Sequence, residues 1–224
     1  MLNGSVIQTV SRQTLGDRVY EQVREAIIRG EMPAGTEINQ VELAARLGVS
    51  RVPVREALRR LQAERFLDAN PFQRYVVTKL SPEQVLELFD LRMELEVFAA
   101  LRARGRDTEK SGLAAARAAA AALDTKMSAE DWLQADMEFH RTVNGRDSAV
   151  ATIIDEVRFR IYRYLHLIEP DLERRVAVLA EHEQILAALE SGDDAAVRGA
   201  ITTHVQHTRD RLALGEGVEA TGAS

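Results

Sequence analysis

The chain has 224 residues, of which 46% are hydrophobic and 29% charged, a composition that excludes a wholly disordered protein. It contains no cysteine, which excludes disulfides, thiolate metal ligands and a cysteine nucleophile, and we expect a cytoplasmic protein. The longest apolar stretch, Leu113 to Leu123, is interrupted by Arg117, and the first residues lack a basic segment followed by an apolar block, so we expect neither membrane insertion nor export.

Charge is distributed unevenly along the chain, although the net charge is -6. Residues 1–80 carry 12 Lys and Arg against 9 Asp and Glu, a net of +3, and the remaining 17 against 26 give -9. A basic first third followed by an acidic remainder predicts a small polyanion-binding domain joined to a domain with another role. We therefore expect two domains, residues 1–80 and 81–214, and a disordered tail at 215–224.

The sequence of the first domain predicts three helices followed by a small β-structure. The helical spacing of apolar residues predicts helices from Leu15 to Gly30, from Val41 to Leu47 and from Arg51 to Ala63. Gly48 lies in the turn before the third helix, and Ser50 is its expected N-cap. Strand-forming residues between Phe66 and Lys79 indicate a two-stranded wing, so this domain is a winged helix-turn-helix.

The third helix carries a ridge of arginines. Arg51, Arg55 and Arg59 recur every four residues, and Arg60 lies beside them. An α-helix fits the major groove of B-DNA, where guanidinium groups reach phosphates and form bidentate hydrogen bonds with guanine. The alternative is a solvated basic face that pairs with Glu56 and Glu64. The turn before the helix and the wing after it favour DNA binding.

The second domain shows only helical patterns. The run Ser81-Pro82-Glu83-Gln84 combines a cap serine, a proline at the first helical position and a glutamine three residues after the cap. Helices are predicted at about 82–104, 108–126, 129–144, 148–168, 171–190 and 194–213. The fold class is therefore mainly α, with the winged helix-turn-helix followed by an all-helical bundle of about six helices.

One aspartate and three histidines of this bundle are predicted to point inward. Asp136 and His140 lie four residues apart beside one apolar stripe, and His182 and His204 lie near the apolar stripes of the last two helices. Carboxylate and imidazole groups are suitable donors for a divalent metal. The alternative is that each group is hydrogen-bonded separately at a helix interface. His166 and His207 are expected at the surface.

Arg92 is the candidate that receives an effector. It lies on the buried stripe of its helix, where an unpaired guanidinium is unfavourable. A carboxylate effector that bridges Arg92 and the metal would satisfy both groups, and an ion pair with Glu96 is the alternative. Arg158 is a second candidate lining residue. One carboxylate and three neutral imidazoles leave a divalent ion with a net charge near +1, which favours an anionic ligand.

The run LAARLGVSRVPVREALRRLQAERFL, preceded by IIRGEMPAG, resembles the winged helix-turn-helix domain of the GntR family of bacterial transcription regulators. The helical second domain resembles the ligand-binding FCD domain of the FadR-like subfamily, and together the two resemblances cover nearly the whole chain. They imply that Ser50, Arg51 and Arg55 contact DNA, with Arg59 extending the same face. They also imply a divalent metal such as zinc, nickel or manganese on a D-x-x-x-H pair and two later histidines, which here are Asp136, His140, His182 and His204.

The chain departs from the family pattern at two positions. Arg74 stands at the wing tip, where the family usually has a glycine that enters the minor groove, and Val41 stands where a basic residue is often found. Arg74 could itself approach the narrow groove or the DNA backbone.

From these observations we expect a ligand-responsive, DNA-binding transcription regulator and not an enzyme. We expect a homodimer that binds double-stranded DNA at a palindromic operator and a small carboxylate effector beside the metal. The resemblance implies a repressor that the effector releases. The alternatives are a metal sensor with the ion itself as signal, a metal-dependent enzyme, and a purely structural metal; the enzyme lacks a general base beside the candidate ligands.

Overall fold

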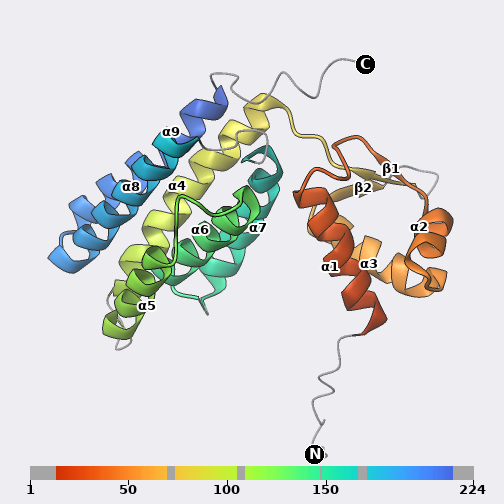
Figure 1. The fold of residues 1–224 in the computed structure, drawn as a ribbon, viewed down its shortest axis with the longest axis horizontal. Coiled ribbons are helices and arrows are strands. Elements are labelled where there is room, and N and C mark those ends of the chain that lie inside the picture. The colour runs from red at the N-terminus through yellow and green to blue at the C-terminus, as the bar shows by residue number, and fades with distance from the viewer. Residues whose placement is uncertain (1–13, 70–73, 105–108, 147, 166–170, 214–224) are drawn as a thin grey trace, which may run out of the picture. The chain divides into compact units, whose positions relative to one another are not determined.

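The computed structural model describes residues 14–69, 74–104, 109–146, 148–165 and 171–213 (Figure 1). The chain divides into two compact units, Met1–Lys79 and Leu80–Ser224. Within the described ranges it forms nine helices and three short strands. Residues 70–73 of the predicted wing, His166 and the tail at 215–224 lie outside the described residues.

The first unit contains three helices and a small sheet. Its elements are α1 (Leu15–Ile28), β1 (Glu37–Ile38), α2 (Gln40–Leu47), α3 (Arg51–Ala63), β2 (Leu67–Ala69) and β3 (Tyr75–Val77). The sheet is antiparallel in the order β1-β3-β2, with Leu67 opposite Val77. The prediction of two strands was incomplete, because β1 has only two residues and no periodicity of its own. It forms because β3 supplies its hydrogen-bond partners.

Local signals end and begin the helices of this unit. The Thr14 and Asp17 side chains form a capping box at the start of α1. Gly48 ends α2 in the left-handed conformation, with φ of 64°, which a glycine adopts without steric cost. Ser50 stands at the N-cap of α3 as predicted, but its side chain makes no capping hydrogen bond.

The buried face of α3 packs against α1 and forms the core of the first unit. Val54, Leu58 and Leu61 are fully buried, and α3 packs against α1, whose buried residues include Val23 and Ile27. Burying one such side chain contributes about 1.5–3 kcal/mol. This packing fixes the rotation of α3, and the face with the arginines is directed to solvent.

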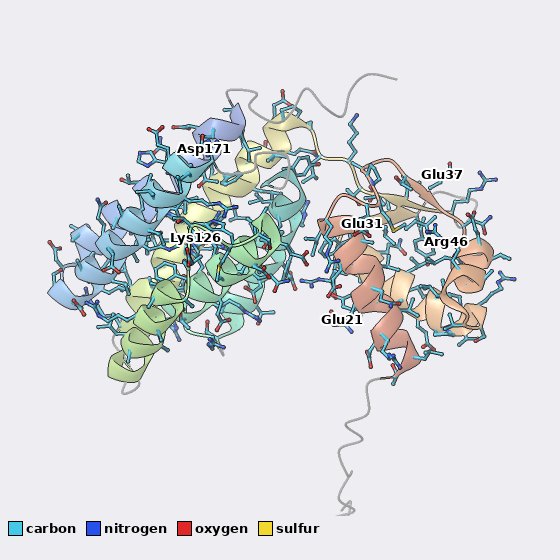
Figure 2. The ribbon with its side chains drawn as sticks, in the orientation of Figure 1. Glu21, Glu31, Glu37, Arg46, Lys126 and Asp171 are labelled. Atoms are coloured by element: carbon cyan, nitrogen blue, oxygen red, sulfur yellow. The ribbon has the colours of Figure 1, made fainter. Side chains whose placement is uncertain are left out.

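The second unit is an all-helical bundle, as predicted. Its described helices are α4 (Pro82–Arg104), α5 (Glu109–Ala121), α6 (Ala129–Val143), α7 (Ala149–Leu165), α8 (Leu172–Ser191) and α9 (Asp194–Ala213). Ser81 and Gln84 form the expected capping box of α4. Asp171, labelled in Figure 2, caps α8 by accepting a hydrogen bond from the Arg174 backbone.

Helix α5 ends earlier than the predicted residue 126. The carbonyl groups of Thr125 and Met127 accept hydrogen bonds from Arg175 of α8 instead of continuing a helical ladder. The guanidinium of Arg175 also lies 5.2 Å from the Trp132 ring. Arg175 thus holds the segment that follows α5 against α8.

The helices of the bundle surround one core. Helix α4 packs against α7 and α9, α5 packs against α6 and α8, and α8 lies beside α9 (Figure 1). Fully buried apolar residues from these helices include Phe89, Phe139, Ile161, Ile185 and Ile201. None of the helices in the described ranges is both long enough and apolar enough to cross a membrane.

Candidate metal-binding and DNA-contacting sites

Three helices of the bundle, α6, α8 and α9, bring Asp136, His140, His182 and His204 together. The three histidines are buried, as the helical spacing predicts, with exposures of 1%, 0% and 3%. One donor atom from each of the four residues can be chosen so that all lie within 4.8 Å of one another. His140 Nε2 lies 3.1 Å from His204 Nε2, and His182 Nε2 lies 3.3 Å from Asp136 Oδ1. The four side chains thus converge, although His140 and His204 also have separate partners at helix interfaces.

Two buried glutamates orient two of these histidines. His140 Nδ1 lies 2.7 Å from Glu96 of α4, and His204 Nδ1 lies 2.7 Å from Glu181 of α8. A carboxylate only accepts hydrogen bonds, so each ring carries its proton on Nδ1. Both Nε2 atoms then present lone pairs toward each other across 3.1 Å. Two facing lone pairs repel unless a cation lies between them.

The ionisation states suit a cation. Burial lowers the pKa of His140 to about 3 and that of His204 to about 4, so both rings are neutral at neutral pH. Burial alone would raise the pKa of Asp136, but the adjacent His140 and His182 rings and the charge of Arg158 hold it well below its usual range. At neutral pH the site therefore offers the Asp136 carboxylate and the neutral imidazoles of His140 and His204, with the His182 ring beside them.

The two candidate effector arginines are both buried but differ in their partners. Arg158 donates from its two terminal amino groups to Glu96 at 3.0 Å and to Asp136 at 2.9 Å. Arg92 donates only its Nε–H, to Glu96 at 2.6 Å, and its terminal amino groups have no hydrogen-bond partner among the described residues. The ion pair of Arg92 with Glu96 is present, yet it leaves most of the donors of Arg92 unused.

The donor set fits a divalent metal ion. Asp136 Oδ2 is held by Arg158, which leaves Oδ1 directed at the histidines. His182 stacks on Phe139 with ring centroids 3.9 Å apart, and neither of its ring nitrogens has a hydrogen-bond partner within the described ranges, including the Nε2 that faces Asp136. A buried polar group without a partner is unfavourable. A bound ion would satisfy the imidazoles together, and one carboxylate with three imidazoles matches zinc, nickel or manganese.

Sequence reasoning missed the role of Glu181. Its carboxylate also accepts a hydrogen bond from His207 Nδ1 at 2.7 Å and two from Arg174, at 2.6 and 3.1 Å. These hydrogen bonds, led by that of His204, overcome the effect of burial and lower the pKa of Glu181 to about 2. His207 is half exposed, in agreement with its predicted position at the surface. Its hydrogen bond with Glu181 was not predicted. The available signal was spacing, because Glu181 lies between Val178 and Ile185 on the buried stripe of α8.

The arginines of α3 separate into two groups. Arg51, Arg55 and Arg59 are exposed and have no ion-pair or hydrogen-bond partner in the described part of the chain. Arg60 instead lies 3.7 Å from the centre of the Tyr20 ring and donates to Glu64 at 3.2 Å.

The acidic residues proposed in the alternative interpretation do not neutralise this ridge. Glu64 is engaged by Arg60 and by the Tyr20 hydroxyl, which donates to it at 2.6 Å. Glu56 lies beside the start of α1, where its Oε2 would stand 3.1 Å from a Cβ if Gly16 carried a side chain. Carboxylates are favoured at a helix N-terminus. The three ridge arginines therefore remain available to an external anion.

The remaining candidate DNA contacts differ in their surroundings. Ser50 is exposed and its hydroxyl is not used to cap α3. Arg74 is exposed and donates to Glu37 of β1 at 3.0 Å (Glu37 is labelled in Figure 2). Val41 is 56% exposed on the first turn of α2.

Two family models match the chain. The model described as "Bacterial regulatory proteins, gntR family" matches residues 15–77, and the model of the FCD domain matches residues 87–207. The chain is 30% identical to the "Nta operon transcriptional regulator" of Aminobacter aminovorans, over 80% of this chain and 85% of that protein. It is 27% identical to the "HTH-type transcriptional repressor RspR" of Escherichia coli, over 89% and 90%. Among solved structures, "E. coli McbR/YncC" has the same fold, with a TM-score of 0.74, 22% identity and coverage of 90% and 98%.

Proposed function

Because the chain belongs to the GntR family of bacterial regulatory proteins and carries an FCD domain, we propose that this DNA-binding transcription regulator holds a divalent metal ion and a small carboxylate effector in its helical bundle. One observation carries the proposal: four donor atoms lie within 4.8 Å of one another inside the bundle. Effector occupancy then changes the affinity for DNA, as the coupling of two sites requires.

Each residue of the cluster has a separate task in this proposal. Asp136, His140, His182 and His204 hold the ion, which supplies a positive centre for an effector oxygen. Glu96 and Glu181 keep the protons of His140 and His204 on Nδ1, and Arg158 fixes the rotation of the Asp136 carboxylate. Zinc, nickel and manganese remain candidates because each accepts imidazole and carboxylate donors.

The charges of the cluster favour an anionic effector. Glu96, Asp136 and Glu181 balance Arg92, Arg158 and Arg174, so the ion itself adds two positive charges without compensation. A small dicarboxylate or hydroxy acid would balance them. The unused amino groups of Arg92 are donors for one carboxylate.

An exposed face of α4 supports the homodimer. Leu91 and Phe98 are 47% and 53% exposed and lie seven residues apart on one stripe, with Glu87 and Arg102 further out. In an antiparallel pair of α4 helices centred between residues 94 and 95, Leu91 faces the partner's Phe98 and Glu87 faces the partner's Arg102. Exposed apolar residues bounded by complementary charges are typical of a two-fold interface. Such a dimer would place one α3 helix in each half of a palindromic operator.

Purified protein tests the proposal directly. Native mass spectrometry with metal analysis should find one ion per chain and a copurified acid, and His204→Ala should lose the ion while His207→Ala keeps it. Binding of the wild-type chain to a palindromic duplex should weaken when the acid is added. Full metal content in His204→Ala would refute the site.

Three other results would identify the alternatives. Release of DNA by metal alone would indicate a metal sensor, and turnover of the acid would indicate an enzyme. Unfolding on metal removal, whether or not the acid is present, would indicate a structural ion. Finding no salt-dependent preference for any duplex sequence would refute the role in DNA binding.

A further inference from the structure

Val52 occupies the middle of the exposed face of α3. The buried residues of this helix are Pro53, Val54, Ala57, Leu58 and Leu61. Each residue of an α-helix is rotated by about 100° from the one before it. The side of the helix directly opposite the average direction of these five buried side chains therefore holds Val52 and Arg59. Val52 is 52% exposed, whereas Val19, Val23 and Val54 of the same unit are at most 3% exposed.

Neither folding nor helix formation accounts for a valine at this position. The side chain adds little to the core because half of it is in solvent. Valine is also a weaker helix former than alanine, lysine or arginine, because its branched Cβ restricts the side chain in a helix. Its position between Arg51 and Arg55, which have no partner among the described residues, places it within the surface proposed to meet DNA.

The chemistry of the side chain restricts what it can recognise. Valine has no hydrogen-bond donor or acceptor beyond the backbone. The base edges in the major groove display donors and acceptors throughout, and their one apolar group is the C5-methyl of thymine. In helix-turn-helix proteins the N-terminal residues of the second helix approach the base edges, and Val52 is the second residue of α3.

We propose that Val52 reads a thymine in each half of the operator through contact with its C5-methyl group. Arg51 and Arg55, which lie on the same side of Val52 around the helix, would hold the helix at this depth through phosphates or guanine. The inference rests on the proposed placement of α3 in the major groove and adds a base preference that the arginines alone do not supply.

Deoxyuridine provides the test, because it differs from thymidine only by that methyl group. The preferred duplex is first selected from random DNA with the full chain, and each thymine is then replaced in turn. For the wild-type chain, one replacement per half-site should raise Kd about fourfold, as expected for one buried methylene-sized group, and replacement in both halves about fifteenfold. Val52→Ala should bind the thymine duplex more weakly and show less than a twofold penalty at that position.

Two further variants make the outcome decisive. Val176→Ala removes a valine of matched exposure, 54%, in the other unit and should retain the wild-type penalty. Val52→Thr keeps one methyl and should show an intermediate penalty. If Val52→Ala retains the full deoxyuridine penalty, or if no thymine shows one with the wild-type chain, the assignment of Val52 is wrong while DNA binding stands. Failure to select any sequence would refute the proposed function as well.

Discussion

Replacing Glu181 by glutamine tests how the second layer of the metal site controls its ligands. The carboxylate accepts hydrogen bonds from His204 Nδ1 and His207 Nδ1, each at 2.7 Å, and from both terminal amino groups of Arg174. A glutamine side chain has one oxygen and one amino group. It therefore cannot accept on both sides as the carboxylate does.

The amide has two orientations, and both disturb the site. If its amino group faces His204, the ring must accept at Nδ1 and carry its proton on Nε2, where the metal requires a lone pair. If its oxygen faces His204, the amino group opposes the Arg174 guanidinium. Loss of such an outer partner lowers metal affinity about 10- to 100-fold, or about 1.4–2.7 kcal/mol.

Competition with a chromophoric zinc chelator measures this loss, and Glu183→Gln, on the exposed side of the same helix, is the matched control. The tautomer of His204 can be observed independently from its ring ¹⁵N shifts in the metal-free protein. We expect Nδ1–H in the wild-type chain and a changed state in Glu181→Gln. Wild-type zinc affinity together with an unchanged tautomer would refute the role of Glu181.

Three further predictions concern the dimer, the Tyr20 contact and the DNA surface. The chain has no cysteine, so a single introduced cysteine is the only thiol that can react. In the proposed α4 pair residue 94 lies close to its own copy, so Glu94→Cys should form a dimer with a short bis-maleimide, whereas Ala118→Cys on the exposed side of α5 should not. Equal cross-linking yields of the two variants would exclude the α4 pairing. Burial and the hydrogen bond with Glu64 raise the pKa of Tyr20 from 10.0 to about 12. The protonated hydroxyl therefore stabilises the fold fully below pH 10, and this stabilisation is lost as the pH rises toward 12. Urea unfolding should show a smaller loss of stability over this range for Tyr20→Phe than for the wild-type chain. Arg55→Ala should reduce the slope of log Kd for DNA against log salt concentration by about 1, because one phosphate contact is lost. Arg60→Ala removes the contact with Tyr20, so it should lower the stability of the protein and leave the slope unchanged.

The sequence by itself determined where the helices lie and which faces they bury, although it placed the end of α5 too late and assigned Ser50 a capping bond that it does not make. The four-residue spacing of Arg51, Arg55 and Arg59 and the positions of His140, His182 and His204 beside apolar stripes follow from the period of the α-helix. Burial of all three histidines agrees with that spacing. Such inferences succeed because the period of a helix is a local property of the chain.

Only the tertiary structure decided which groups meet across the helices. It separates Arg60, held by Tyr20 and Glu64, from Arg59, which has no partner among the described residues, although the two are adjacent in sequence. It also brings Glu96 to His140 across 44 residues and pairs β1 with β3. Helical periodicity determines the side on which a residue lies, but the rotation and height of the neighbouring helix determine its partner, and these depend on how the whole core packs.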